Sequence, residues 1–310
     1  MARVIFMGTP QFAVPTLRTL VEAQEVVGVV TQPDRPAGRG RDLHQSAVKQ
    51  EAVARGLPVF QPRSLRTPEA ATHLEQWKPD VIVVAAFGQI LTEAVLDLPL
   101  HGCLNVHASL LPRWRGAAPV AAAILAGDEV TGVTIMKMNP GLDTGPIVAQ
   151  REEPIRPEDT RMTLTERLSI LGAELLVETL PGYVSGEIEP RPQDDEKATF
   201  AERLRKEDGR LDWSRPAGVL DRKIRAFNPW PGTFSFWKGR RLKVIEASLL
   251  LDWEGEASPG TVLDVEDGAA VATGEGALRL EEIQLAGKRA MAIRPFLQGR
   301  QDFVGSQLDG

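Results

Sequence analysis

Residues 3–31, RVIFMGTPQFAVPTLRTLVEAQEVVGVVT, contain the pattern of a strand, a helix and a second strand in succession. The apolar run at 3–7 stops at Gly8 and predicts a strand, and apolar residues at helical spacing predict a helix over 12–23. The run at 25–31 predicts the second strand. Because a helix that links two such strands makes them parallel, with a right-handed crossover, the chain begins with a βαβ unit.

The same alternation continues downstream. Buried-strand patterns recur, and helical patterns lie between them: strands at 80–86 (DVIVVAA), 102–107 (GCLNVH), 131–138 (TGVTIMKM) and 147–153, helices at 45–55, 68–77 and 117–126. This order predicts a Rossmann-like, doubly wound, mainly parallel sheet with helices on both faces. Ligands of such sheets bind at the carboxyl ends of the strands, so we expect the functional residues there.

The composition changes after a long amphipathic helix predicted at 163–183. The stretch 186–198, GEIEPRPQDDEKA, is rich in proline and charge, which is typical of a linker. A helix at 215–227 and five short β segments then predict a small β-barrel of the oligonucleotide-binding (OB-like) type. We therefore expect three parts: the Rossmann-like domain at 1–188, a linker at 189–206 and the barrel at 207–310.

Composition excludes several classes of protein. The chain has 310 residues, 43% hydrophobic and 25% charged, which is ordinary for a globular protein. Its single cysteine, Cys103, excludes an internal disulfide and a paired-cysteine zinc site, and the four histidines lack ligand spacing, so we expect no metal. The sequence begins without a signal-peptide pattern, and no apolar run approaches the roughly 18 residues of a membrane helix. We expect a cytoplasmic protein without a membrane partner.

The formal net charge of −6 conceals an acidic region and a basic region. Residues 151–200 hold six Lys or Arg against twelve Asp or Glu, whereas residues 200–250 hold twelve against six. Four of the six tryptophans lie in or beside the basic region: Trp213, Trp230, Trp237 and Trp253. Positive charge interleaved with aromatic rings suits a phosphate backbone and unpaired bases. A solvated helix face above an aromatic core would have the same composition.

Three polar residues stand where such a sheet places its ligands. Asn105 and His107 lie near the end of the predicted strand 102–107, and because side chains alternate along a strand, both project from one face. Asp143 lies in the segment 141–145, GLDTG, whose glycines permit a tight backbone course. A carboxylate beside a histidine favours the protonated imidazole, so the set suits proton transfer. Each residue also has a purely structural interpretation. His107 could be a core histidine whose hydrogen bonds are satisfied, Asn105 could bond to the backbone, and 141–145 could be an ordinary turn.

Three other features are weaker signals. Ser109 lacks the GxSxG elbow of a nucleophilic serine. Cys103 shares the predicted strand of His107, and we expect it to be a buried small hydrophobe rather than a thiolate. The first βα turn, GTPQF at 8–12, matches neither GxGxxG nor a phosphate-binding P-loop, so it does not favour a nucleotide cofactor.

The segment 105–119, NVHASLLPRWRGAAP, resembles the core of the formyltransferases that use 10-formyltetrahydrofolate. Asn105, His107 and Asp143 match the Asn, His and Asp of that family residue by residue, and the segment 132–136, GVTIM, matches as well. Further segments narrow the resemblance to members that act on methionyl initiator tRNA: 7–10 (MGTP), 31–40 (TQPDRPAGRG), 58–62 (PVFQP) and 224–231 (IRAFNPWP). The resemblance covers almost the whole chain.

The resemblance implies transfer of the formyl group from the co-substrate 10-formyltetrahydrofolate to the α-amino group of methionine on the initiator tRNA. The product, formylmethionyl-tRNA, starts translation. In this reaction an amine attacks an activated, amide-like carbonyl. His107 would accept or relay the amine proton, Asn105 would donate a hydrogen bond to the oxyanion, and Asp143 would orient and polarise His107. This chemistry needs no metal.

By the same resemblance, two segments would bind the folate. The family's folate-binding loop corresponds to Ser109, Leu110, Leu111 and Pro112. The segment that begins at Phe87, FGQIL, lies where the pterin pocket is expected. Its backbone would bind the edge of the pterin, while Ile90 and Leu91 would pack on the flat face. The alternative for this segment is a buried turn between a strand and a helix.

The segment Gln32–Lys49 is longer than an ordinary βα loop of about two to six residues. By resemblance it enters the acceptor arm of the tRNA, and the basic C-terminal part holds the rest of that molecule. The residues expected to bind tRNA are Arg35, Arg39, Arg41 and Lys206. The resemblance also favours a monomer.

Two alternatives stay open. A formyltransferase that acts on an amino-sugar nucleotide or on glycinamide ribonucleotide would share Asn105, His107 and Asp143, but a small substrate needs neither a basic loop nor a basic barrel. A non-catalytic tRNA-binding module that kept the fold would not need the intact Asn, His and Asp set. Methionyl initiator tRNA is therefore the expected partner.

Overall fold

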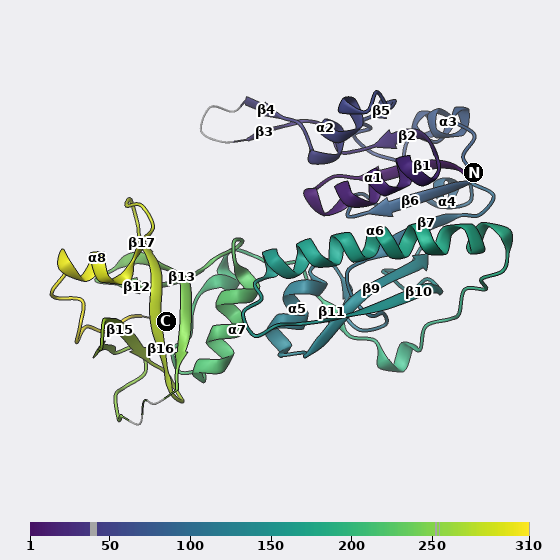
Figure 1. Cartoon of the computed structure of the whole chain (residues 1–310). Coiled ribbons are helices and arrows are strands. Elements are labelled where there is room, and N and C mark those ends of the chain that lie inside the picture. The colour runs from purple at the N-terminus through teal and green to yellow at the C-terminus, as the bar shows by residue number, and fades with distance from the viewer. Residues whose placement is uncertain (38–41, 252, 254, 310) are drawn as a thin grey trace. The chain divides into compact units, whose positions relative to one another are not determined.

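The computed structural model describes residues 1–37, 42–251, 253 and 255–309 (Figure 1). Its contacts define two compact units: unit 1 with Met1–Pro119, Val130–Pro154 and Thr165–Ala201, and unit 2 with Val120–Glu129, Ile155–Leu164 and Glu202–Gly310. The domain boundaries expected from the sequence stay a prediction. Within the described residues, no helix combines the length and the apolar character that crossing a membrane requires.

The described part of unit 1 contains a seven-stranded sheet in the order β10-β9-β7-β6-β1-β2-β5. Its strands are β1 (Arg3–Gly8), β2 (Glu25–Val30), β5 (Val59–Phe60), β6 (Val81–Ala85), β7 (Cys103–His107), β9 (Val130–Lys137) and β10 (Ile147–Pro154). The five strands from β7 to β5 are parallel, whereas β9 pairs antiparallel with both β7 and β10. The expected mainly parallel sheet is confirmed.

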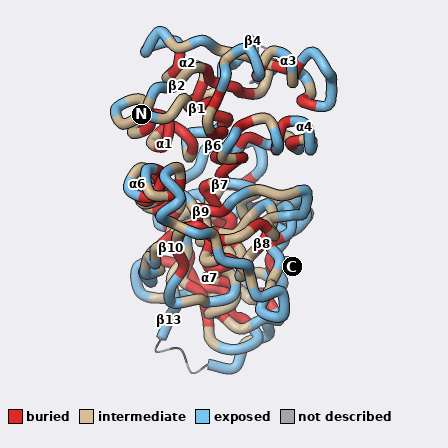
Figure 2. The backbone as a smooth tube through the Cα atoms, turned by 90° about the vertical axis from the view of Figure 1, so that its right-hand side faces the viewer, coloured by how far each residue is buried: buried red, intermediate tan, exposed pale blue. Residues whose placement is uncertain are grey.

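Helices cover both faces of this sheet. Buried residues are concentrated along β1, β6, β7 and β9 (Figure 2). The helices that lie wholly or mostly in unit 1 are α1 (Val14–Ala23), α2 (Ala47–Ala54), α3 (Pro68–Gln76), α4 (Glu93–Leu96) and α6 (Arg161–Ser185), whereas most of α5 (Pro119–Ala126) belongs to unit 2. Residues of α3 and α4 share a core cluster with Cys103 of β7. On the opposite face, Gly172 of α6 lies so close to β7 that a Cβ would stand 2.6 Å from Val106. Because side chains alternate, Asn105 and His107 share the face of Cys103.

The long segment after β2 forms a β-hairpin, which periodicity did not predict. Strands β3 (Arg35–Ala37) and β4 (Asp42–His44) pair antiparallel, and the tip at 38–41 lies outside the described residues. Polar contacts hold the base of the hairpin: Lys49 forms an ion pair with Asp34, and Gln61 Nε2 donates to Asp34 Oδ1 at 2.8 Å. Leu43 on β4 is 69% exposed, so this hairpin lacks the buried apolar run by which hydrophobic patterning reveals a strand.

Residues 187–201, most of which the sequence assigned to a linker, lie along unit 1. Arg191 and Ile147 exchange two backbone hydrogen bonds of 2.8 Å. Farther on, β11 (Phe200–Ala201) pairs in parallel with β8 (Arg115–Gly116). The segment has few apolar side chains, so backbone pairing and side-chain hydrogen bonds, rather than hydrophobic burial, hold it in place.

Unit 2 contains the antiparallel sheet β12-β13-β16-β15-β14, with β17 paired to β16. Its elements are α7 (Ala217–Phe227), β12 (Thr233–Trp237), β13 (Arg240–Leu250), β14 (Val262–Val265), β15 (Gly268–Ala272), β16 (Ala277–Leu285), β17 (Met291–Ala292) and α8 (Ile293–Gln298). Aromatic rings meet edge to face in its core, with 5.2 Å between the ring centres of Trp237 and Phe303.

One short segment, 305–309, pairs with both edges of this sheet. Gly305 N donates to Val262 O at 2.8 Å, on the β14 edge. Asp309 and Phe236 exchange backbone hydrogen bonds of 2.9 and 3.1 Å, on the β12 edge. Because the same segment satisfies both edge strands, the sheet closes into a small barrel. The expected order of an α/β sheet domain followed by an antiparallel β domain is confirmed.

Candidate active site

Strand β7 carries Asn105 and His107 to the carboxyl edge of the parallel sheet. The strand lies between β6 and β9, so Asn105 stands opposite Val84 and Met136, and His107 stands opposite Thr134. Asn105 is half-buried, and His107 is 7% exposed. The two side chains predicted from strand alternation are therefore held by backbone pairing on both sides.

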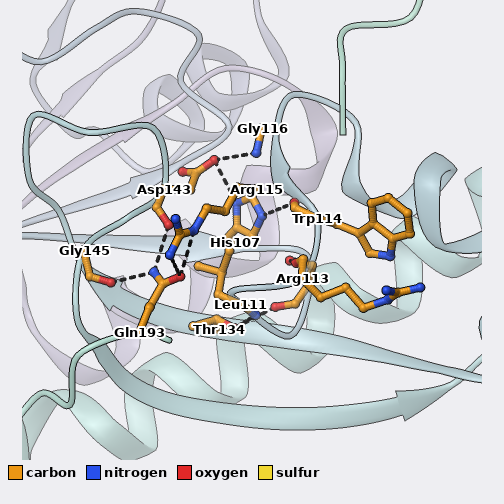
Figure 3. Close-up of polar contacts among 11 residues, drawn as sticks. His107, Leu111, Arg113, Trp114, Arg115, Gly116, Thr134, Asp143, Gly145 and Gln193 are labelled. Atoms are coloured by element: carbon orange, nitrogen blue, oxygen red, sulfur yellow. Dashed lines mark hydrogen bonds and ion pairs between the residues drawn. The ribbon is translucent and has the colours of Figure 1, made fainter. Parts of the chain in front are cut away.

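The ring of His107 is oriented by a carbonyl group. Its Nε2 atom lies 3.1 Å from the carbonyl oxygen of Trp114. Because a carbonyl oxygen only accepts hydrogen bonds, we assign the hydrogen to Nε2, which leaves Nδ1 as the proton-accepting atom of the neutral ring. Nδ1 faces Asp143 Oδ2 at 3.8 Å, as Figure 3 shows. The site thus presents a proton acceptor beside a carboxylate.

Asp143 lies beside this ring. It lies in the loop between β9 and β10 with φ of 51°, a left-handed conformation that Asp adopts more readily than most residues. Its Oδ2 accepts a hydrogen bond of 2.9 Å from Gly116 N. The 3.8 Å to His107 is an ion-pair distance rather than a hydrogen-bond distance. The Trp114 carbonyl therefore holds the imidazole by a hydrogen bond, and the Asp143 carboxylate lies beside Nδ1.

Gln193 is a site residue that the sequence analysis missed. Its Nε2 donates to the carbonyls of Asp143 at 2.8 Å and of Gly145 at 2.7 Å. Its Oε1 accepts from Arg115 Nε at 3.0 Å and Nη2 at 2.8 Å (Figure 3). Gln193 stands in a segment with the composition of a linker, so no local pattern could have revealed this role.

The predicted folate loop is fixed by a buried hydroxyl. Thr134 Oγ1 donates to Ser109 O at 2.6 Å and accepts from Leu111 N at 3.0 Å. Gln150 Nε2 donates both to Thr134 Oγ1 at 3.0 Å and to Leu111 O at 2.8 Å. Leu111 packs in a buried cluster, whereas Leu110 and Pro112 are half-buried. The four predicted folate residues therefore occupy one rigid loop directly after His107.

The second predicted folate segment follows β6, so it starts at the same edge of the sheet. Phe87 and Leu91 are buried in the core cluster beside α3 and α4. Ile90 is 70% exposed. The Phe87 carbonyl accepts from Thr9 Oγ1 at 2.8 Å and from Gln32 Nε2 at 3.1 Å. The side chain of Ile90 and the loop backbone are thus the parts accessible to a ligand, while Phe87 and Leu91 support them from below.

Two nucleophile candidates are occupied by structural contacts. Ser109 is fully buried, and its hydroxyl donates to Arg113 O at 2.6 Å. Burial raises the pKa of the Cys103 thiol to about 12, and its Sγ lies 3.5 Å from the carbonyl oxygen of Val95. Neither group is poised to attack a substrate. Among the described residues, no three His, Cys, Asp or Glu side chains gather as metal ligands would.

The predicted tRNA-binding residues are only partly described. Arg35 is exposed on β3 and donates to Gln32 Oε1, and Lys206 is exposed at the start of the β-rich part of unit 2. Arg39 and Arg41 lie outside the described residues.

Unit 2 combines cations with aromatic rings, as its composition suggested. The Arg241 guanidinium lies 3.7 Å from the ring centre of Phe234, and that of Arg210 lies 5.7 Å from the ring centre of Phe236. Arg210 is exposed and Arg241 is half-buried, and both lie within the distance of a cation–π interaction.

A Rossmann-like sheet with an Asn, His and Asp set at its carboxyl edge, followed by a small antiparallel barrel, defines a group-transferring enzyme of the formyltransferase type. The Formyl transferase family profile matches residues 2–180, and the Formyl transferase, C-terminal domain profile matches residues 203–301. This chain belongs to the formyl transferase family.

Individual relatives match along nearly the full chain. A protein of Thiobacillus denitrificans named methionyl-tRNA formyltransferase is 52% identical over 308 residues, which cover 99% of each chain. A protein of the same name from Hydrogenovibrio crunogenus is 50% identical over 305 residues, 96% of each chain.

Solved structures share the fold at lower identity. An N-formyltransferase from Helicobacter canadensis, in complex with folinic acid and dTDP-3-aminofucose, has a TM-score of 0.68 at 19% identity and covers 93% of this chain and 100% of that one. HypX from Aquifex aeolicus, in complex with tetrahydrofolic acid, has a TM-score of 0.65 at 19% identity over 98% of this chain and 48% of that one.

Proposed function

We propose that this chain transfers the formyl group of 10-formyltetrahydrofolate to the α-amino group of methionyl initiator tRNA. The observation that carries the proposal is the 52% identity to a methionyl-tRNA formyltransferase over 99% of both chains, through the catalytic segment and the barrel alike. The product is formylmethionyl-tRNA for translation initiation. We place the enzyme in the cytoplasm as a monomer.

The arrangement of Asn105, His107 and Asp143 supports a direct transfer. The amine nitrogen attacks the formyl carbon, a C–N bond forms, and the proton lost by the amine passes to His107 Nδ1. Asp143 stabilises the resulting imidazolium from 3.8 Å. Asn105 donates a hydrogen bond to the oxyanion of the tetrahedral intermediate. When the bond from carbon to the folate nitrogen breaks, His107 returns the proton to that nitrogen.

The two loops after β6 and β7 suit a folate co-substrate. The loop Ser109–Pro112 is rigid, and the segment Phe87–Leu91 offers backbone groups and the exposed side chain of Ile90. Both segments follow parallel strands at the carboxyl edge of the sheet, where ligands of such folds bind. Two structures with the same fold were solved with folates, namely folinic acid and tetrahydrofolic acid.

For the tRNA, we propose contacts from the hairpin after β2 and from unit 2. Arg35, Arg39 and Arg41 belong to the segment Gln32–Lys49, and Lys206 lies in the basic stretch 200–250. The excess of Lys and Arg over Asp and Glu in residues 200–250 supports this assignment, because phosphate contacts account for much of the affinity for nucleic acids.

A single assay tests the function. The purified chain is incubated with 10-formyltetrahydrofolate and methionyl initiator tRNA, and the aminoacyl ester is hydrolysed and analysed for formylmethionine. Parallel reactions replace the tRNA by a dTDP-amino sugar or by glycinamide ribonucleotide. Formylmethionine in the first reaction only is the expected result. A folded chain that formylates only a small amine, or nothing, would contradict the proposal.

A further inference from the structure

The loop that carries Asp143 is held from outside its own strands. Leu142 beside it is 62% exposed, and Asn139 Oδ1 accepts from Thr144 Oγ1 at 2.9 Å within the loop itself. The Asp143 and Gly145 carbonyls, on either side of Thr144, both accept from Gln193 Nε2. The side-chain amide of Gln193 thus holds the loop at two points, the carbonyl groups of Asp143 and Gly145.

The orientation of the Gln193 amide is itself determined by its partners. Its Oε1 faces Arg115, which has only donors, and its Nε2 faces two carbonyl oxygens, which only accept. The Arg115 side chain is 4% exposed, and its Nη2 also donates to Asp195 Oδ1 at 2.7 Å. A buried guanidinium with three fixed hydrogen bonds therefore anchors Gln193.

The same segment also supports the residue that orients His107. Thr199 Oγ1 accepts from Trp114 N at 2.9 Å, and the carbonyl of Trp114 bonds His107. Thr199 N donates to Pro112 O at 3.2 Å, at the end of the predicted folate loop. Gln193 thus holds the loop of Asp143, and Thr199 holds Trp114, whose carbonyl bonds His107.

We infer that two side chains of the segment 193–199, those of Gln193 and Thr199, make it a strap that positions the reacting pair, with Gln193 as a positioning residue that acts through Asp143. The inference rests on the proposed function, in which Asp143 stabilises the protonated His107. Asp143 and His107 stand 3.8 Å apart without a hydrogen bond between them, so their separation depends on the elements that hold each one. A displacement of about 1 Å at such a site can lower turnover about 100-fold.

Two substitutions of Gln193 test the strap. Gln193→Glu keeps an oxygen for Arg115 but places a carboxylate oxygen against the Asp143 and Gly145 carbonyls, so the clamp on the loop is lost. Gln193→Met has a similar length and removes both sets of hydrogen bonds. We expect kcat to fall about 10- to 100-fold in both variants, with KM for folate and for tRNA within about a factor of two.

A matched control comes from the same segment. Lys197, whose side chain is 78% exposed and pairs with Asp194, does not contact the Asp143 loop. Lys197→Ala should keep the wild-type kcat. The thermal midpoint of each variant is measured in parallel. If Gln193→Met does not fold, Gln193→Glu, which retains the partner of the buried Arg115, carries the test.

A double substitution separates positioning from general packing. If Gln193 acts through Asp143, then Gln193→Met combined with Asp143→Asn should be no slower than Asp143→Asn alone in single-turnover assays. Multiplicative losses would overturn this role, as would a wild-type kcat in the two Gln193 variants. Absence of formylmethionine with the wild-type chain would instead overturn the proposed function, and this inference with it.

Discussion

At the residue scale, Asn105 is the expected donor to the oxyanion. It is half-buried on the same strand face as His107, and removal of one such donor typically costs about 100- to 1000-fold in turnover. We expect this loss in kcat for Asn105→Ala, measured by formylation of methionyl-tRNA under saturating substrates. An unchanged circular dichroism spectrum serves as the folding control. A kcat within a few-fold of wild type would remove Asn105 from the mechanism.

His107 and Asp143 are expected to matter in different ways. His107→Ala removes the proton acceptor, so kcat should fall by about 100- to 10,000-fold. Asp143→Ala leaves the hydrogen bond of the ring to the Trp114 carbonyl at 3.1 Å and removes the carboxylate beside Nδ1, together with the acceptor of the Gly116 N hydrogen bond. Its loss in kcat should therefore be no larger than that of His107→Ala. Near wild-type turnover in either variant would contradict the assignment.

Local sequence patterns indicated these three residues: strand alternation indicated Asn105 and His107, and the glycines on either side of Asp143 indicated the third. They could not locate Gln193, Thr199 or the Trp114 carbonyl, whose roles depend on contacts between segments far apart in the chain. Asn105 and His107 follow from one strand, whereas Gln193 meets Asp143 across fifty residues. A backbone carbonyl such as that of Trp114 also leaves no trace in residue type.

At the scale of elements, the Thr134 hydroxyl of β9 supports the loop Ser109–Pro112. Thr134→Val keeps the shape but leaves Leu111 N, Ser109 O and the Gln150 amide short of a partner. Each buried polar group left unsatisfied costs about 1–3 kcal/mol. We expect a lower free energy of unfolding in urea and a raised KM for folate.

The conservative variant provides the control for that loop. Thr134→Ser retains a hydroxyl at the same place, so its KM for folate should be close to that of the wild type. Equal KM values in the Val variant, the Ser variant and the wild type would show that the loop does not bind folate.

Helices α1 and α2 are joined by a charge cluster with a defined pH dependence. Hydrogen bonds from Arg18 and Arg55 lower the pKa of Glu51 from 4.5 to about 2. A carboxyl group whose folded-state pKa is lowered stabilises the fold above its ordinary pKa, and this contribution disappears as the pH falls through the folded value. The wild type should therefore be more stable than Glu51→Gln at pH 7, and the difference should shrink between pH 4.5 and about pH 2.

Urea unfolding at several pH values measures this difference. Glu22→Gln, at an exposed position of α1, serves as the control. A difference that stays constant down to about pH 2 would contradict the role of Glu51.

The element boundaries show what periodicity can and cannot reveal. Apolar runs located β1, β2, β6, β7 and β9, because buried strands need continuous apolar sequence. Strand β10 was also located, although only its first residues are apolar and buried. The hairpin β3–β4 was missed because polar contacts hold its base. The two-residue strand β5 (Val59–Phe60) was missed because it is too short for a pattern. The antiparallel direction of β9 is a property of topology rather than of local sequence.

At the scale of the whole molecule, binding of tRNA should depend strongly on salt. The chain has a net charge of −6, yet residues 200–250 hold twice as many Lys and Arg as Asp and Glu. The logarithm of the association constant for initiator tRNA should fall linearly with the logarithm of the salt concentration. Lys206→Ala should reduce the slope by about 1 if Lys206 contacts a phosphate.

Filter binding at several salt concentrations measures that slope. Lys288→Ala, at an exposed position outside the basic stretch, is the control and should leave the slope unchanged. Equal slopes in the wild type and in Lys206→Ala would exclude a phosphate contact at Lys206.

The contact between the strap and the Asp143 loop has a consequence for the recombination of domains during evolution. The family profile for the N-terminal part ends at residue 180, but Gln193 and Thr199 lie beyond that point. A recombination event that joined residues 1–180 to a new partner domain would transfer Asn105, His107 and Asp143 without the groups that hold them. Such a chimera would inherit the reacting groups and would still have to acquire a replacement for the strap.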